Sequence, residues 1–281
     1  MNSILEFRVP LGDAIEAVLD FLTTTLSPLT RFASNTLEAG IDGIDAALIF
    51  LPPWLLLLVI TAIVWFVSKS KGLTIFSVIG LALIWNMELW DPMISTITLV
   101  LIATLIAVLI GLPLGIIAAL SKKFHNVITP ILDFMQTMPA FVYLIPAIPF
   151  FGLGPVSAIF ATVIFSIPPA IRLTDLGIRQ INMELIEAAD AFGSTKMQKL
   201  VKVQLPLAVP TIMAGVNQTI MLSLSMVVIA AMIGAGGLGG EVWRAIQRLK
   251  PGMGFEAGIA VVIIAMLLDR ITQNITTSNK R

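Results

Sequence analysis

The sequence contains no cysteine and a single histidine, His125. Without cysteine the chain can form no disulfide and offers no thiolate for metal binding or redox chemistry. One imidazole is also too few for a histidine-based zinc site or catalytic cluster. These two absences exclude thiol chemistry and zinc chemistry as functions of this chain.

Charge is also scarce, and it is balanced. Charged residues make up 12% of the chain, and 17 Lys and Arg face 17 Asp and Glu, so the surplus of positive charge that nucleic-acid binding requires is absent. Hydrophobic residues make up 57%, and the mean hydropathy of +0.98 is far above that of a soluble domain. At roughly 20 residues per span, the chain length and hydropathy predict an all-α polytopic membrane protein with about six spans.

The N-terminal segment does not have the pattern of a cleaved signal, because Glu6, Asp13 and Glu16 interrupt its apolar residues. We expect it to be retained. Residues 11–38 place apolar side chains at helical spacing with acidic residues between them, which indicates an amphipathic helix instead of a span. A surface helix that supports the bundle and a membrane-sensing helix both fit. We assign residues 1–45 to this segment and expect it on the external side.

Seven apolar segments follow, and they predict a transmembrane domain over residues 46–275 with a short tail at 276–281. Proline and glycine in the third segment indicate a kink or close helix packing, and three prolines interrupt the fourth. The segments are residues 46–67, 73–88, 94–120, 127–151, 157–171, 210–233 and 258–268.

The orientation follows from Lys and Arg, which concentrate in cytoplasmic loops. If each segment crosses once, three basic loops fall on one side, at residues 69–71, 122–123 and 179–202. The basic loop at 241–250 falls on the other side and disagrees. Three loops against one predict an external N-terminal helix and a cytoplasmic C-terminus.

A compact polar stretch over residues 178–206 interrupts the apolar pattern. Glu184, Glu187 and Asp190 recur at helical spacing among small alanines, and Gly193 stands where the end of a helix favours positive φ. A second short helix is predicted from Ser194, ending before the next span. Small alanines would let the first helix enter a groove of another protein. A loop of two amphipathic helices lying on the lipid surface fits equally well from these residues alone.

The spacing of this stretch resembles the EAA loop of bacterial ABC importer permeases. Glu187-Ala188-Ala189 is followed after three residues by Gly193 and after nine more by Val203-Gln204-Leu205-Pro206, with Val203 where isoleucine is usual. Longer stretches, within about Trp90 to Gln273, are similar to the permease subunit of the glycine betaine, proline betaine and choline osmoprotectant importers. These stretches are residues 133–144, 202–207, 215–219 and 224–230.

The resemblance implies a type I importer fold and several partners. These are a second copy of this chain, two ATP-binding cassette subunits in the cytoplasm and an extracytoplasmic substrate-binding protein. The chain contains no GxxxxGK[ST] motif, so ATP and Mg²⁺ are expected on the partner ATPase and no cofactor is expected here. The residues expected to couple the permease to the ATPase are Glu187, Ala188, Ala189, Asp190, Gly193, Leu205 and Pro206.

The substrate path is sought among polar residues inside the apolar segments, because such residues are unfavourable in lipid unless they pair or face water. A full aromatic cage, at about 0.5 to 2 kcal/mol per cation–π contact, is expected in the binding protein because this chain has one tyrosine. Interhelical hydrogen bonding is the alternative role for each candidate. The candidates are Gln136, Thr137, Met138, Tyr143, Asn217, Gln218, Thr219, Ser223 and Ser225.

Three other functions remain open from the sequence. The chain could belong to an importer for another small solute. A secondary transporter would place paired ions at the midplane of inverted repeats, and no convincing repeat is visible. An assembly factor would have no transport role. Copurification of an ATPase together with ATP-dependent uptake would distinguish an importer from the last two.

Overall fold

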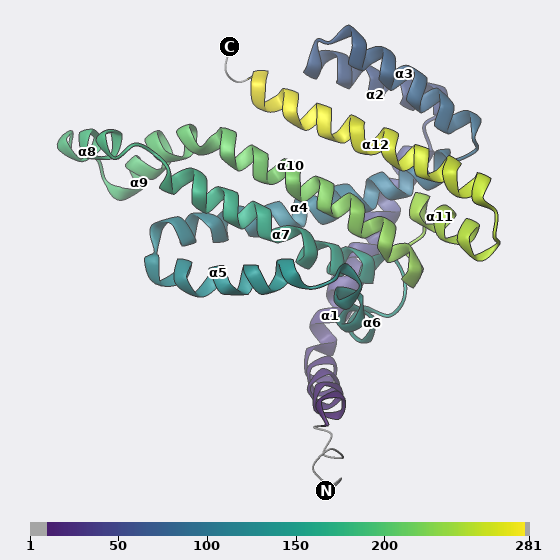
Figure 1. Cartoon of the computed structure of the whole chain (residues 1–281), viewed down its shortest axis with the longest axis horizontal. Helices are drawn as coiled ribbons and strands as arrows, with labels where there is room; N and C mark the ends of the chain where they lie inside the picture. The colour runs from purple at the N-terminus through teal and green to yellow at the C-terminus, as the bar shows by residue number, and fades with distance from the viewer. Residues whose placement is uncertain (1–9, 279–281) are drawn as a thin grey trace, which may run out of the picture.

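The computed structural model describes residues 10–278, and this part of the chain is helical throughout, with short connections (Figure 1). The α-helices are supplemented by two short 3₁₀ segments, η1 and η3, and one π-helical turn, η2. The elements are α1 (Leu11–Ile49), α2 (Pro53–Ser68), α3 (Lys71–Asn86), α4 (Trp90–Leu120), α5 (Lys122–Thr137), η1 (Ala140–Tyr143), α6 (Leu144–Phe151), α7 (Pro155–Arg179), α8 (Met183–Ala191), α9 (Lys196–Lys199), η2 (Leu200–Gln204), α10 (Leu205–Ala230), η3 (Ala231–Ile233), α11 (Gly237–Gln247) and α12 (Pro251–Ser278).

Helices α4, α7 and α10 form the centre of the bundle and pack closely through glycine. A Cβ at Gly111 would lie 2.7 Å from Ala170 Cβ, and one at Gly115 would lie 2.6 Å from Thr174 Cβ. Gly215 brings α10 equally close to α7. Helix α4 continues through Pro113 as one element, so this proline and the glycines beside it serve close packing and do not end the helix.

The first predicted span, residues 46–67, is wrong at its start. Residues 46–49 belong to α1, and α2 begins only at Pro53, after a bend of 101°. Pro52 and Pro53 lack the backbone N–H that would continue α1, and Pro53 occupies the first helical position of α2, where that loss is harmless.

Helix α1 is exposed over its first part and packed over its last part. Phe21 and Phe32 are exposed, whereas Ile41 is 6% exposed and packs in the core with residues of α4, α6 and α7. The Asp45 carboxylate accepts hydrogen bonds from Ser95, at 3.3 Å, and from Thr98 of α4. The predicted amphipathic helix is therefore longer than expected and is attached to the bundle at its C-terminal end.

The fourth predicted span, residues 127–151, is not a single helix. The pair formed by α5 and the η1–α6 segment is bent by 111°. The break falls at Met138, whose φ of −71° and ψ of 134° are extended. Pro139 accounts for this, because its ring disfavours the helical conformation for the residue before it.

The chain turns again after α10, in a glycine-rich stretch over residues 234–240. Gly234, Gly236 and Gly237 have φ of 88°, 76° and 66°, values that favour glycine. Helix α12 then spans Pro251–Ser278 and is longer than the predicted segment at 258–268.

Span counting by length and composition agrees with the expected number. Four stretches are long and apolar enough to cross a membrane by themselves, and up to six are if each bent pair counts as one span. Helix α3 is apolar but shorter than these stretches. The four are Trp90–Leu120, Pro155–Arg179, Lys196–Ile233 and Pro251–Asn274.

The three basic loops used for orientation lie at one end of the bundle. Ser70, in the α2–α3 turn, lines the same surface hollow as Arg270 of α12. Leu120, at the α4–α5 turn, lines another hollow with Lys196. The hydrogen bond between Asn217 and Asp269 joins the middle of α10 to the second half of α12. Assigning this end to the cytoplasm stays a prediction, and Lys280 and Arg281 lie outside the described residues.

Candidate functional site

Four of the seven predicted coupling residues, Glu187 to Asp190, lie in the short helix α8 between α7 and α10. Asn182 caps α8, its side chain accepting the Glu184 N–H at 3.0 Å. Glu187, Ala188 and Asp190 are exposed on α8. Ala189 is 8% exposed and faces the rest of the loop. The glutamate and the first alanine are thus available to a partner.

Gly193 reverses the chain after α8, as its position in the sequence predicts. Its φ is +74°, and its N–H donates to the Asp190 carbonyl at 2.9 Å. The Ser194 N–H donates to the Ala189 carbonyl at 3.1 Å, which completes a glycine-ended helix terminus. No atom outside its neighbours lies within 4 Å of a Cβ placed at Gly193, so its backbone conformation, and not crowding, requires glycine here.

A second set of bonds fixes α9 against α8. Thr195 and Gln198 form a capping box at the start of α9. Lys199 Nζ lies 2.7 Å from both carboxylate oxygens of Asp190. Asp190 therefore has a structural role inside the loop, in addition to the docking role that the sequence suggested.

The loop exposes apolar side chains that sequence reasoning did not select. Phe192 is 90% exposed, and Met183 and Met197 are more than half exposed. Figure 1 shows α8 and α9 projecting beyond the ends of α7 and α10. An apolar residue immediately before the helix-ending glycine was the available signal in the sequence. Exposed apolar side chains on a projecting loop favour protein docking.

Leu205 and Pro206 connect the loop to the bundle. Leu205 packs with a cluster that includes Ile178, Leu200 and Ala208. Pro206 stands at the start of α10, after the π-helical turn. A displacement of α8 and α9 would therefore reach α10 and the end of α7 directly.

The predicted path residues of the fourth segment separate into two environments. Gln136 and Thr137 are exposed at the end of α5, and Met138 is partly exposed. Tyr143 is 4% exposed, its hydroxyl donates to the Met135 carbonyl, and its ring makes an edge contact with Phe165. The only tyrosine therefore belongs to the core in this conformation.

The predicted path residues of α10 divide in the same way. Gln218 and Ser225 are exposed. Thr219 donates to the Gly215 carbonyl of its own helix, and Ser223 donates to Ser166 Oγ of α7 at 3.0 Å. For these two buried residues, hydrogen bonding inside the bundle is the observed arrangement.

Asn217 joins α10 to α12 through an acidic residue that the sequence did not single out. Its Nδ2 donates to Asp269 Oδ1 at 2.9 Å. Its Oδ1 is buried and finds no hydrogen-bond partner within the described chain. A polar atom left in this state inside a membrane bundle marks a place where a water molecule or a rearrangement would be favourable.

Two further groups of charges connect α4, α5 and α7 in the halves nearest the basic loops. Asp175, 9% exposed, lies 2.8 Å from His125 Nδ1 and 2.6 Å from Arg179 Nε. Arg179 also donates to the Ala118 carbonyl at 2.8 Å. Separately, Arg172 Nη2 donates to Asp133 Oδ1, joining α7 to α5. Sequence reasoning missed these pairs because their members are 39 to 61 residues apart, apart from Asp175 and Arg179.

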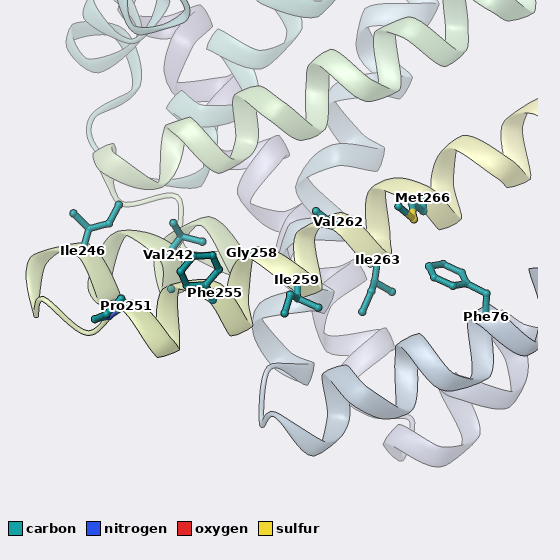
Figure 2. Close-up of a pocket in the computed structure, with 11 residues that line it drawn as sticks. Phe76, Val242, Ile246, Pro251, Phe255, Gly258, Ile259, Val262, Ile263 and Met266 are labelled. Carbon is teal, nitrogen blue, oxygen red and sulfur yellow. The ribbon is translucent and has the colours of Figure 1, made fainter.

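An apolar pocket lies away from all of these residues. Figure 2 shows Phe76 of α3, Val242 and Ile246 of α11, and apolar side chains of α12 around a pocket of about 710 Å³. Every residue that lines it is apolar or glycine, and Phe255 is 73% exposed. This chemistry suits lipid or apolar protein contact and offers no groups for a charged solute.

Comparison with known proteins identifies the family. Residues 111–278 match the family model described as "Binding-protein-dependent transport system inner membrane component". The chain is 52% identical to the glycine betaine transport system permease protein OpuAB of Bacillus subtilis, over 97% of this chain and 96% of that protein. It is 52% identical to the glycine betaine/carnitine transport permease protein GbuB of Listeria monocytogenes, over 94% and 95%.

A third relative and a solved structure agree with this result. The glycine betaine/proline betaine permease ProW of Escherichia coli is 44% identical over 94% of this chain and 75% of that protein. The fold resembles an inward-facing structure of the MetNI methionine ABC transporter, with a TM-score of 0.62 and 22% identity over 75% of this chain and 100% of that one. At that identity the likeness shows the fold alone.

These matches exclude the secondary-transporter and assembly-factor readings. They also place ATP hydrolysis on a separate subunit and imply an ATPase and a binding protein as partners. The chain belongs to the binding-protein-dependent transport system inner membrane components and is the membrane-embedded, non-catalytic permease subunit of an ABC importer.

Proposed function

We propose that this permease moves quaternary ammonium osmoprotectants into the cell, with glycine betaine as the principal substrate and proline betaine, choline or carnitine as the further candidates. The observation that carries the proposal is 52% identity, over nearly the whole chain, to two permeases named for glycine betaine transport. An importer for another small solute is the alternative.

The working unit in this proposal contains two copies of the permease, two ATP-binding cassette subunits and a binding protein. ATP and Mg²⁺ are bound by the cassettes. ATP binding closes the cassettes and moves both coupling loops together, which switches the two bundles between inward-facing and outward-facing states. The protruding α8–α9 loop supports this, since its exposed Glu187, Ala188 and Phe192 are free to enter a cleft.

The substrate path runs along the exposed polar residues of α5 and α10. Gln136, Thr137, Gln218 and Ser225 are exposed on helices of a membrane bundle, where polar side chains are favourable only next to water or a partner. Tyr143, Thr219 and Ser223 support the path from behind through packing and hydrogen bonds. Met138 and Asn217 are partly exposed and belong to neither group.

The organisation of the chain follows from the same proposal. Residues 1–45 form an external amphipathic segment, residues 46–275 form the permease domain with its coupling loop at 178–206, and residues 276–281 form a cytoplasmic tail. Anchoring of α1 to α4 through Asp45 supports an N-terminal segment that is attached to the permease domain.

Uptake competition tests the substrate proposal. The permease, its ATPase and its binding protein are reconstituted in liposomes, and ATP-dependent uptake of labelled glycine betaine is measured with excess unlabelled proline betaine, choline or carnitine. Glycine betaine itself should compete most strongly, and vesicles without internal ATP serve as the control. Absence of ATP-dependent glycine betaine uptake by an assembled, ATP-hydrolysing complex would reject the proposal.

A further inference from the structure

Helix α5 presents three different faces along its length. Ile128 and Leu132 pack toward the core, while Val127, Ile131 and Phe134 form an exposed apolar face. A third face is polar, and its members are four, three, four and three residues apart, the spacing of one side of a helix. This polar stripe consists of Lys122, Asn126, Thr129, Asp133 and Gln136.

The polar stripe lies in the inner half of the bundle. Asp133 is about 16 Å along α5 from Lys122, at 1.5 Å per residue, and Arg172 is about 10 Å along α7 from Arg179. Both starting points belong to the end that carries the basic loops. The Asp133–Arg172 ion pair therefore stands at membrane depth, where lipid would oppose charges that do not face water.

The exposure of this pair distinguishes it from the other charge cluster on α7. The Asp133 side chain is 60% exposed and that of Arg172 is 34% exposed. The Asp175 side chain, by contrast, is 12% exposed and meets both His125 and Arg179. Asp175 therefore has a structural role, bound to two partners, whereas Asp133 has one partner and is otherwise exposed.

The hydrogen-bonding capacity of the pair is only partly used. Arg172 makes one bond to Asp133, through Nη2, and its buried Nε finds no partner within residues 10–278. A guanidinium binds carboxylates best through two parallel N–H donors. Arg172 can therefore accept a second carboxylate without first losing a complete set of bonds.

We propose that Asp133 and Arg172 form a zwitterion-recognition step in the inner half of the path, where Arg172 binds the substrate carboxylate while Asp133 attracts its quaternary ammonium. The inference rests on the proposed function, since a betaine carries these two charges on one small molecule. The ion pair between Asp133 and Arg172 is replaced by two ion pairs with the substrate, so no charge is left unpaired during passage. Gln136, one turn beyond Asp133, continues the polar stripe toward the outer side.

The test compares transport with ATP hydrolysis in the same reconstituted vesicles. For Arg172→Gln, with saturating liganded binding protein, glycine betaine uptake should fall about tenfold or more while stimulated ATPase stays within about twofold. Asp133→Asn, at a more exposed position, should give the same separation and stands in if Arg172→Gln does not assemble. Arg270→Gln, an exposed arginine on α12 at the same end, is the matched control and should leave both rates unchanged.

The outcomes separate this inference from the proposal beneath it. If the unchanged complex takes up no glycine betaine, the proposed function fails. If the unchanged complex transports it and the variants either retain uptake or lose uptake and ATPase in proportion, the pair is only a tether between α5 and α7. Either of the latter results overturns the inference and leaves the proposed function standing.

Discussion

Gly115 lies where α4 crosses α7 with no room for a side chain. A Cβ at this position would lie 2.6 Å from Thr174 Cβ and 2.7 Å from the Ile171 carbonyl oxygen. The second of these neighbours is backbone, so it cannot rotate away. In membrane helices, where lipid is as apolar as the helix surface, such close backbone approach is a principal source of association.

Replacing Gly115 with alanine should destabilise the bundle. We expect a loss of about 1–3 kcal/mol from overpacking, seen as a lower thermal unfolding midpoint of the detergent-solubilised complex. Gly258→Ala, on α12 with no atom within 4 Å of the added Cβ, is the control and should be neutral or slightly stabilising. Equal midpoints for the two variants would show that α4 and α7 separate at no cost.

At the scale of elements, the α8–α9 loop, which we propose as the coupling loop, is braced by its own hydrogen bonds. The Lys199–Asp190 pair and the Thr195–Gln198 capping box fix α9 to α8, and Gly193 sets the angle between them. Phe192 is left 90% exposed at the turn. A large aromatic side chain held on a rigid protrusion has little entropy to lose on docking, which favours it as a binding anchor.

Changing Phe192 to serine should weaken association with the ATPase subunit by about tenfold or more, as loss of a central aromatic anchor does in other interfaces. Pull-down of the ATPase with increasing salt and subunit concentration measures this. Phe50→Ser is the matched control. Phe50 is 87% exposed and follows α1, at the end of α2 that lies away from the α2–α3 turn. Unchanged ATPase association for Phe192→Ser would remove this side chain from the interface.

Helix α1 is joined to the bundle near its C-terminal end by one acidic residue. Asp45 bonds to two hydroxyls of α4, and Ile41 packs one turn earlier. Both lie in the last part of the helix. The first part keeps Phe21 and Phe32 exposed, which suits contact with lipid or with a neighbouring subunit.

At the scale of the whole molecule, the bundle has chemically different sides at equal depth. Gln218 and Leu109 are both exposed, and they lie about 20 Å and 17 Å along their helices from the ends of α10 and α4 nearest the basic loops. The path proposal requires water beside Gln218, whereas the neighbours of Leu109 on the α4 surface, Leu101 and Leu105, are apolar.

Single-cysteine variants test this difference, because the natural chain has no thiol to interfere. In the assembled complex, Gln218→Cys should react with a charged thiol reagent at least about tenfold faster than Leu109→Cys, since the reactive thiolate forms only where water is present. Each variant must first retain ATP-dependent uptake. Equal rates for the two cysteines would place Gln218 outside the water-filled path.

Patterns within a few residues were enough to predict much of this protein. The hydropathy predicted a helical membrane bundle, and the position of Gly193 predicted the turn that ends α8. The coupling role of the α8–α9 loop stays a prediction. Both patterns are local signals, since helix formation and helix ends depend on neighbours in sequence. The same local reasoning misplaced the α1–α2 boundary and joined α5 to α6, because two prolines at 52–53 and one at 139 decide bends that hydropathy does not register.

The tertiary structure alone decided which polar residues face one another. Tyr143, Thr219 and Ser223 looked equivalent to Gln136 and Gln218 in sequence, yet the first three are buried and bonded while the last two are exposed. Asp133 meets Arg172 from 39 residues away. Composition and spacing determine that a polar residue lies in an apolar helix. Only the rotation of each packed helix about its own axis determines whether that residue meets a partner, lipid or the path.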